Sequence, residues 1–588
     1  MKNVSIDAGN AGCGLPRAVQ WLLVGAILLA ITARALGTLR PVFSDEFLIL
    51  GNLWDFVQDR TIIPGHTRYP SLYSYMTAPL TGLFALLSVA AGLPPSIYDF
   101  SEWMAYRPEL AMWPARMVSF ACWGVCVWAV HLMTTEIPGN RRMGIVGAGA
   151  FAAAFGTLDY SGYGLPDTAM MMWSALALLF ALRMMRGDRP TQDAFVAGLL
   201  AGLAVSTKYS AIAIFPPLVA AALLHCEGWR RGLRLIGTGA IGTLVGFVLG
   251  TPGWVLAFES FAEGLAWERA HMARGHLGYT GVPLLGQLEL LVGADLPLMV
   301  LAVTGSLMWA RRRPNREFGV LIVAAVAVFA MAAPARKQSL HYLFVLYPVA
   351  AVLLAGGLST IGGNARRVGT SVVALACVGT AVFSLWWGYR VALVPDSLHV
   401  AREWINARMP DEAVIAMDWT GVPRLVCEDE VEGLREGLRT DFTRNIYAGL
   451  RTFPTVSIDH RVDFLYQTEA EWLVTSSICH ARFFEFGRFT RIRPAPESEI
   501  GREFARRRAF YRALQNGGGG WRLEYEVRTG NGPAVQIYRR GRSGETFTPD
   551  ADGAPTRCAR WTPPGELSPN PGASGCTPVV PLLRACSG

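Results

Sequence analysis

Long apolar segments recur through the first 390 residues of this chain and constrain its fold more than any other feature. A helix needs about 20 mostly apolar residues to cross the hydrocarbon core of a membrane. Only 17% of the residues are charged and the mean hydropathy is +0.30, whereas an average soluble domain carries about 25% charge. The sequence therefore predicts a polytopic α-helical membrane protein. Eleven segments have spanning or near-spanning length: 19–39, 112–134, 144–157, 168–185, 194–208, 210–225, 233–256, 284–309, 317–334, 340–360 and 368–388.

A further apolar stretch, residues 71–93, is interrupted by Pro79 and followed directly by Pro94 and Pro95. Cytoplasmic loops of membrane proteins are enriched in Lys and Arg. If 71–93 does not cross the membrane, all the later basic clusters are cytoplasmic, and if it crosses, all of them lie outside. We therefore predict eleven spans, a cytoplasmic N-terminus, and a juxtamembrane or re-entrant element at 71–93. The clusters are Arg141 and Arg142; Arg183, Arg186 and Arg189; Arg230, Arg231 and Arg234; Arg311, Arg312, Arg313 and Arg316; and Arg366 and Arg367.

This topology places most polar residues of interest on the extracytoplasmic face of the cell membrane. The formal net charge of +8 then reflects loops that orient helices, and it predicts no nucleic-acid partner. The nucleotide-binding motif GxxxxGK[ST] is absent, which argues against ATP and soluble nucleotide sugars as substrates. The outer segments are the loop 40–111, the turn 158–167, STKYS at 206–210, the loop 257–283 and PARKQSLHY at 334–342.

Two adjacent carboxylates, Asp45 and Glu46, follow the first apolar segment almost directly. A carboxylate this close to lipid is costly. Ionised at the membrane surface, it could act as a general base toward a hydroxyl group. Acidic residues also favour helix N-termini, so a solvated helix start is the alternative. Position alone leaves both interpretations open.

Other polar groups on the same face suit an anionic ligand. Lys208 stands alone in a nearly uncharged stretch, where a phosphate partner would suit it, although it could also extend to the membrane surface. Arg336, Lys337 and His341 add potential cations on the face where the positive-inside rule predicts few. Asp167, in the turn YGLPD, is either a helix start or a second carboxylate of a shared site.

Beyond residue 390 the composition becomes that of a soluble domain. Residues 397–418 are typical of an amphipathic helix followed by a buried strand, 498–515 of an Arg-rich helix, and 521–540 of a hairpin that turns at Gly530-Asn531-Gly532. We expect a small extracytoplasmic α/β domain over 391–540 and a disordered tail rich in Pro, Gly and Ser over 541–588. Outside the cytoplasm, disulfides could form among Cys427, Cys479, Cys558, Cys576 and Cys586.

The order of these motifs resembles that of bacterial GT-C membrane glycosyltransferases, in particular the family 39-like group that includes protein O-mannosyltransferases and lipid A aminoarabinose transferases. The resemblance covers residues 17–390, with departures: YPSLY replaces a PPLY-like form, and Tyr160 and Tyr163 stand where an Arg often precedes the PD pair. The motifs are the DE pair at 45–46, PSLY at 70–73, the span headed by Arg116, YGLPD at 163–167, STKYS, and HYLFVLYP at 341–348.

The resemblance implies a GT-C fold and inverting transfer of a hexosyl or pentosyl group from a polyprenyl-phosphate donor to a hydroxyl of a glycan, lipid or protein. Asp45 would be the general base, Glu46 its acidic companion and Asp167 the second acidic residue. Mg²⁺ or Mn²⁺ could bind between Asp45 and Asp167, although the family does not uniformly need a metal. Lys208, Arg336, Lys337 and His341 would contact the donor phosphate. The residues expected to contact substrate are His66, Arg68, Tyr69, Tyr163 and Tyr342.

Two other functions remain open at this stage. A transporter or flippase of lipid-linked saccharides would need polar residues on both faces and near the bilayer midplane, with related halves. A non-catalytic assembly or sensor protein would leave Asp45, Asp167 and Lys208 without a joint purpose. The sequence leaves the sugar, the acceptor and the oligomeric state undetermined.

Overall fold

The structure, a computed structural model, describes most of the membrane region and parts of the C-terminal region. His66, Cys226, His276 and residues 542–588 of the expected tail lie outside the described residues, and the side chain of Cys427 is not described. The described residues are 15–40, 45–58, 60–65, 67–93, 100, 108–137, 141–225, 228–275, 277, 280–312, 314–410, 412–418, 422–423, 426–427, 452–453, 455–457, 470–485, 493–517 and 520–541.

The regular secondary structure of the membrane region is helical, with short 3₁₀-helices labelled η. Its first half contains α1 (Arg17–Gly37), α2 (Glu46–Gln58), α3 (Leu72–Ala90), α5 (Pro108–Ala111), α6 (Trp113–Glu136), α7 (Arg141–Ala153), η2 (Phe155–Thr157), α8 (Leu158–Gly162), α9 (Pro166–Arg186) and α10 (Pro190–Thr207). Its second half contains η3 (Tyr209–Ile214), α11 (Phe215–His225), α12 (Trp229–Gly250), α13 (Gly253–Leu256), α14 (Phe258–Arg274), α15 (Leu285–Arg312), α16 (Arg316–Ala332), η4 (Leu340–Leu343), α17 (Leu346–Thr360) and α18 (Gly363–Leu393).

Each of the eleven predicted segments coincides with a helix or a pair of consecutive helices. By length and composition, seven helices of the described chain could cross a membrane, or eight spans if the bent pair formed by α7 and η2–α8 counts as one. The helix α3, predicted not to cross, is among the seven, whereas α10, η3–α11, α16 and α17 fall short. The chain is therefore an integral membrane protein, and the number eleven and the non-crossing of 71–93 stay predictions.

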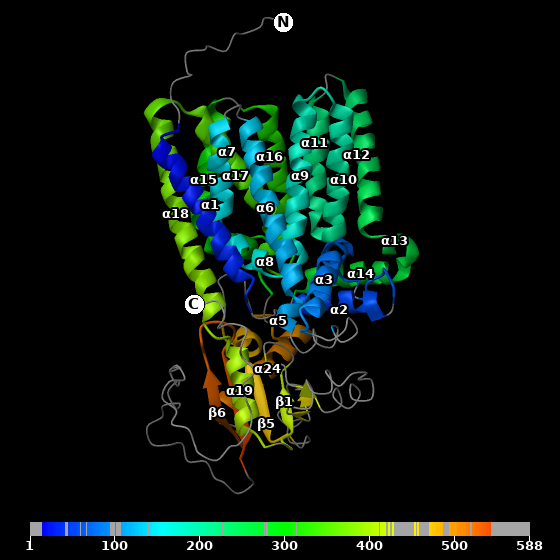
Figure 1. Ribbon diagram of the computed structural model, residues 1–588, viewed down its shortest axis with the longest axis vertical. Coiled ribbons are helices and arrows are strands. Elements are labelled where there is room, and N and C mark those ends of the chain that lie inside the picture. Colours follow the sequence, from blue (N-terminus) through cyan, green and yellow to red (C-terminus); the bar gives the residue numbers. More distant parts are fainter. Residues whose placement is uncertain are drawn as a thin grey trace, which may run out of the picture. The chain divides into compact units, whose positions relative to one another are not determined.

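One end of the bundle collects the elements that the sequence analysis singled out. Figure 1 shows α2, α3, α5, α13 and α14 gathered at this end, which α8 also approaches. The helix α9 begins here with Asp167, and α10 ends here just before Lys208. The predicted convergence of the polar segments on one side of the bundle is therefore present in the fold.

Glycines allow α10 and α12 to pack closely. A Cβ atom on Gly202 would lie 2.2 Å from the carbonyl oxygen of Thr243, and one on Gly246 would lie 2.2 Å from that of Leu199. Small residues of this kind bring helix backbones together where lipid provides no hydrophobic drive for association. This contact fixes α10, and with it the position of Lys208 at its end.

The C-terminal region confirms the predicted helix, strand and hairpin. Its central sheet has the order β4-β1-β5-β7-β6, with β4, β1 and β5 parallel and β6 and β7 an antiparallel hairpin. The strand β5 is buried along its whole length, as a central strand must be. Its elements are α19 (Ser397–Arg408), β1 (Ile415–Met417), β2 (Val426–Cys427), β3 (Thr452–Phe453), β4 (Thr455–Ser457), β5 (Trp472–Ser476), α23 (Ser477–His480), η5 (Ala481–Phe483), α24 (Glu499–Gln515), β6 (Trp521–Val527) and β7 (Val535–Arg540).

The hairpin turn joins this sheet to the end of α18. Gly530 and Gly532 adopt positive φ angles of 80° and 83°, a region that only glycine enters without strain. Between them, the Asn531 side chain donates hydrogen bonds to the carbonyl oxygens of Val391 (3.1 Å) and Val394 (2.8 Å). Cys479 is buried, and because the side chains of the other cysteines expected to pair are not described, the disulfides stay a prediction. The domain boundaries near 390 and 541 stay predictions.

Candidate active site

Asp45 occupies the position directly before α2. Its carbonyl oxygen accepts a hydrogen bond from the N–H of Leu48 (3.3 Å), so the chain turns into the helix at this residue. Its side chain is half-buried. Asp45 is therefore a helix start whose side chain is not fully buried, and the two interpretations of the DE pair are compatible at this residue.

Glu46, one residue further on, is completely buried and paired with Arg116. The Arg116 guanidinium donates two parallel hydrogen bonds to the Glu46 carboxylate, of 2.9 and 2.8 Å, and the backbone N–H of Gly164 donates a third of 2.7 Å. The two side chains are 0% and 1% exposed. A carboxylate enclosed in this way has no surface for a substrate, so its position favours a structural role over the catalytic one that the resemblance implied.

Arg116 also ties the chain before Asp45 into the bundle. It donates hydrogen bonds to the carbonyl oxygens of Thr38 (3.0 Å) and Arg40 (2.5 Å), which follow α1. One arginine at the start of α6 thereby joins the end of α1, the start of α2 and, through Glu46, the turn that contains Gly164. Asp45 lies within the chain segment that this arginine holds at both ends.

Asp167 and Lys208 form the second buried ion pair of this region. The Lys208 ammonium donates a 2.7 Å hydrogen bond to Asp167 Oδ1, and the side chains are 6% and 3% exposed respectively. Asp167 belongs to the first turn of α9, and the backbone N–H of Lys208 still bonds to Ala204 of α10. The ammonium also lies 5.3 Å from the ring centre of Tyr69 and 5.6 Å from that of Tyr342.

His341 and Tyr160 form a polar contact beside this pair. The Nδ1 atom of His341 lies 2.9 Å from the hydroxyl of Tyr160 and 2.8 Å from the Oγ atom of Ser339. Both rings are half-buried. Tyr160 comes from α8 and His341 from η4, so this contact joins two elements that are distant in sequence.

The charges of Asp45 and Asp167 both affect two side chains outside the spans, those of Tyr69 and Lys337. Burial raises the pKa of Tyr69 well above its usual value, and the charges of Asp45 and Asp167 raise it further. Burial lowers the pKa of Lys337, while Glu268, Asp45 and Asp167 oppose that shift. Asp45 and Asp167 therefore both lie close enough to Tyr69 and Lys337 to act on them electrostatically, and these four residues define a common region.

The loop that contains Arg336 and Lys337 is held against α14. The backbone N–H groups of Arg336 and Lys337 both point to the carbonyl oxygen of Met272, at 3.1 and 3.4 Å, and Thr280 forms an isolated β-bridge with Lys337. The Lys337 side chain is half-buried, whereas that of Arg336 is exposed. The structure thus brings Lys337 to the common region and leaves Arg336 at its surface.

The sequence analysis did not single out Arg40, which lies at the same turn as Tyr163. Its guanidinium stacks 4.1 Å from the centre of the Tyr163 ring and bonds to the Asp159 carboxylate at 2.9 Å. Trp387 of α18 donates to the same carboxylate oxygen at 3.0 Å. Arg40 thus brings a charge to the turn at 158–167 from another element, and no motif in the sequence marked it.

Arg68 lies apart from the two ion pairs. Its guanidinium covers the ring of Trp267 at 3.9 Å, and that ring stacks in turn on His271 of the same helix, α14. Arg68 is exposed. The side chain expected to contact substrate thus packs on α14, and the neighbouring His66 lies outside the described residues.

The described side chains do not form a ready metal site. Among them, no three His, Cys, Asp or Glu residues lie close enough together to hold a metal ion. The Asp167 carboxylate is already paired with Lys208. Mg²⁺ usually binds through one or two carboxylates together with water and substrate oxygens, so a metal ion between Asp45 and Asp167 stays a prediction.

Comparison with known proteins gives one family match and several similar folds. Residues 108–256, which include Arg116, Asp167 and Lys208, match the family model described as dolichyl-phosphate-mannose-protein mannosyltransferase. The crystal structure of ArnT from Cupriavidus metallidurans bound to undecaprenyl phosphate is similar at a TM-score of 0.50 and 14% identity, over 89% of this chain and 98% of that one. No curated protein sequence matches this chain.

An oligosaccharyltransferase from Archaeoglobus fulgidus is similar at a TM-score of 0.49 and 14% identity, over 87% of this chain and 80% of that one. At such identities the likeness to ArnT concerns the fold alone. The family match covers residues 108–256, and over most of its length the chain has a fold similar to that of ArnT. The residues of the site are therefore weighed on their own geometry.

Proposed function

We propose that this protein transfers a sugar from a polyprenyl-phosphate donor to an acceptor hydroxyl at the extracytoplasmic face of the membrane. The observation that carries the proposal is the arrangement around Lys208: a buried ammonium, one acidic partner, two aromatic rings and a half-buried Asp45 nearby. The family matched by residues 108–256 is named for mannosyl transfer from dolichyl phosphate, and the solved ArnT structure holds undecaprenyl phosphate. Both support a lipid-linked donor here.

Lys208 and Lys337 would receive the donor phosphate. An ammonium has three N–H donors, and Asp167 accepts one of those of Lys208 at 2.7 Å. The remaining donors face the rings of Tyr69 and Tyr342, where a phosphate oxygen could replace a weaker contact. Asp167 would keep the ammonium of Lys208 directed at this point. A carboxylate partner favours the charged form of an ammonium in a region of low dielectric constant.

Asp45 would be the general base of the transfer. As the acceptor oxygen attacks the anomeric carbon, the bond from that carbon to the phosphate oxygen breaks and its electron pair leaves with the polyprenyl phosphate. The hydroxyl proton passes to the Asp45 carboxylate, and attack opposite the leaving group inverts the anomeric centre. Fixed cations that stabilise the charge developing on the phosphate contribute most to such a reaction.

Glu46 takes a positioning role in this proposal. Its carboxylate is occupied by Arg116 and Gly164 and is 0% exposed, so it holds the segment before α2 in place. The sugar that moves and the acceptor, whether glycan, lipid or protein, depend on contacts made only when substrates are bound.

A transporter of lipid-linked saccharides is less well supported. It requires ionisable groups along a path through the bilayer. The buried charged side chains within the described spans that lie away from the site are engaged with other protein groups, as Asp295 is with the backbone N–H groups of Phe155 and Gly156. The polar groups of the candidate active site collect at one end of the bundle.

The test is a transfer assay with purified protein, polyprenyl-phosphate sugars and candidate acceptors. We expect Asp45→Asn to reduce kcat by about 10²–10⁴-fold, the usual contribution of a general base, while the affinity for polyprenyl phosphate stays nearly unchanged. Asp55→Asn, a change of another α2 carboxylate, is the matched control. Equal rates for wild type and Asp45→Asn would remove Asp45 from the mechanism, and no transfer from any lipid-linked donor would remove the proposed function.

A further inference from the structure

A carboxylate lies inside a candidate membrane span, away from the site described above. Asp295 of α15 is 3% exposed, and its backbone leaves the helical conformation, with φ −144° and ψ 50°. Pro297 follows two residues later. A charged residue at this depth is costly, and such residues usually have a specific function.

The Asp295 carboxylate accepts hydrogen bonds from the backbone at a break between two helices. The helix α7 ends at Ala153, and η2–α8 continues at an angle of 58° to it. Such a break leaves backbone N–H groups without an intrahelical partner, which is costly within a membrane. The N–H groups of Phe155 and Gly156 donate to the two oxygens of Asp295, at 2.8 and 2.5 Å.

Arg34 of α1 forms hydrogen bonds with other polar groups at the same break. Its guanidinium donates hydrogen bonds of 2.9 Å to the carbonyl oxygen of Ala154 and to the hydroxyl of Thr157. It also stacks 4.2 Å from the ring centre of Trp123. A carboxylate and a guanidinium from two different spans thus hold the four residues 154–157 at the bend.

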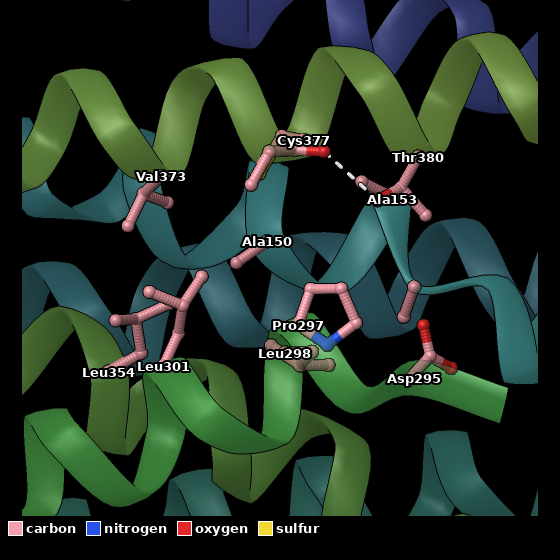
Figure 2. A pocket seen from close by; sticks show the side chains of 12 residues that line it. Ala150, Ala153, Asp295, Pro297, Leu298, Leu301, Leu354, Val373, Cys377 and Thr380 are labelled. Atoms are coloured by element: carbon pink, nitrogen blue, oxygen red, sulfur yellow. Dashed lines mark hydrogen bonds between the residues drawn. The ribbon is translucent and has the colours of Figure 1, made fainter. Parts of the chain in front are cut away.

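The packing around Asp295 leaves little freedom at this point. A Cβ atom on Gly156 would lie closest to the Tyr347 hydroxyl and 2.6 Å from Asp295 Oδ2, so a larger residue there would displace both side chains. Figure 2 shows Asp295 at the edge of a small cavity whose lining includes Pro297 and Leu298. The cavity measures about 20 Å³ and its lining is mainly apolar, which favours the carboxylate's contact with the backbone N–H groups.

The segment held in this way leads directly to the candidate active site. Tyr160 of α8 places its hydroxyl 2.9 Å from His341, and its carbonyl oxygen accepts a hydrogen bond from Thr168, the residue after Asp167. Only a few residues separate this tyrosine from the amides that Asp295 binds. A shift at the bend would therefore be transmitted to Tyr160.

We propose that Asp295 is a positioning residue for sugar transfer: its contact with the amides of Phe155 and Gly156 sets the direction of α8 and so places Tyr160 against His341. This inference rests on the proposed function. It assigns Asp295 no contact with substrate, because the residue acts through the backbone of α8.

The test compares Asp295→Asn and Gly156→Ala with wild type in detergent. Both variants disturb the contact between Asp295 and the amides, the first by removing charge and the second by displacing an intact carboxylate together with the Tyr347 hydroxyl. We expect each to lower kcat about tenfold while the KM for the lipid donor changes less than twofold. Hydrogen–deuterium exchange of residues 155–162 should become faster in both. Thr304→Ala, an exposed change on the same helix, is the control and should match wild type.

A double-mutant cycle separates positioning from general destabilisation. If Asp295 acts through Tyr160, Asp295→Asn should cost less in a Tyr160→Phe background than in wild type, because coupled residues are not additive. The inference would be overturned if the kcat losses of Asp295→Asn and Tyr160→Phe simply multiplied in the double variant. It would also be overturned if Asp295→Asn and Gly156→Ala both kept normal kcat and normal hydrogen–deuterium exchange. If wild type transfers no sugar, the proposed function fails, and unchanged exchange at 155–162 would independently show that Asp295 does not hold α8.

Discussion

Glu46–Arg116 and Asp167–Lys208 are two ion pairs buried at the same end of the bundle, and they differ in how fully their polar atoms are used. In the first pair the arginine donates to both carboxylate oxygens and to two carbonyl groups, and Gly164 adds a further N–H. In the second pair one hydrogen bond joins the ammonium to one oxygen, beside aromatic rings. The first pair is enclosed and fully hydrogen-bonded, whereas the second makes fewer hydrogen bonds, and we propose that it has donors left for an anion.

The largest expected effect concerns the enclosed pair, Glu46–Arg116. Glu46→Gln keeps the shape of the side chain but leaves the Arg116 charge buried and unpaired, a loss that typically costs about 3–5 kcal/mol of folding free energy. We expect a corresponding fall in the midpoint of thermal or denaturant unfolding in detergent. Glu259→Gln, which changes a carboxylate in the first turn of α14, is the control. An unchanged unfolding midpoint for Glu46→Gln would show that the Glu46–Arg116 pair does not stabilise the folded protein.

The next effect concerns the Asp167–Lys208 pair. Lys208→Met should weaken binding of polyprenyl phosphate by about 10–100-fold, because a hydrogen-bonded cation is lost from the phosphate site. The double variant Asp167→Asn/Lys208→Met should regain stability, because no lone charge stays buried, without regaining affinity. Binding titrations and unfolding midpoints measured on the same preparations would test this. Recovery of affinity in the double variant would show that Lys208 does not bind the phosphate.

A smaller effect should appear in the pH dependence. Burial lowers the pKa of Lys337 from its usual 10.5, so the ammonium loses its proton at a lower pH than an ordinary lysine. Raising the pH through this range removes a cation from the phosphate site, and the KM for the donor should rise. Lys337→Arg should abolish that rise, since arginine stays charged. A rise of equal size in the arginine variant would assign it to another group.

The smallest expected effect is that of metal removal. The Asp167 carboxylate is engaged by Lys208, and the described residues provide no cluster of three metal ligands. We therefore expect treatment with EDTA, or addition of Mg²⁺ or Mn²⁺ afterwards, to change the transfer rate less than twofold. Loss of activity in EDTA that is restored by Mn²⁺ would show that the Asp167–Lys208 pair rearranges around a cation.

The hydrophobic pattern and the distribution of arginines predicted much of this molecule. The eleven apolar segments all became helices, and the polar segments that the positive-inside rule placed on one face collect at one end of the bundle. The hairpin around Asn531 followed from the preference of glycine for positive φ. These features depend on local spacing and on loop charge, which a single sequence displays directly.

The partners of the charged residues could not be read in this way. Glu46 and Arg116 are 70 residues apart, and Asp159 is joined to both Arg40 and Trp387. Asp45 and Glu46 are neighbours in sequence and look equivalent, yet one is half-buried and the other is fully enclosed. Helical periodicity shows which face of a helix is apolar but not which helix lies next to it.

By itself, the sequence determined the class of protein, the positions of its helices and the end of the bundle where its polar residues gather, because each span must meet the demands of the membrane independently. Only the tertiary structure decided which charged residues are enclosed and fully hydrogen-bonded, as Glu46 and Arg116 are, and which make fewer hydrogen bonds, as Lys208 does. It also revealed that Asp295 and Arg34, in two distant spans, hold the bend before α8. Such assignments depend on contacts between distant segments, and those contacts exist only once the helices have packed.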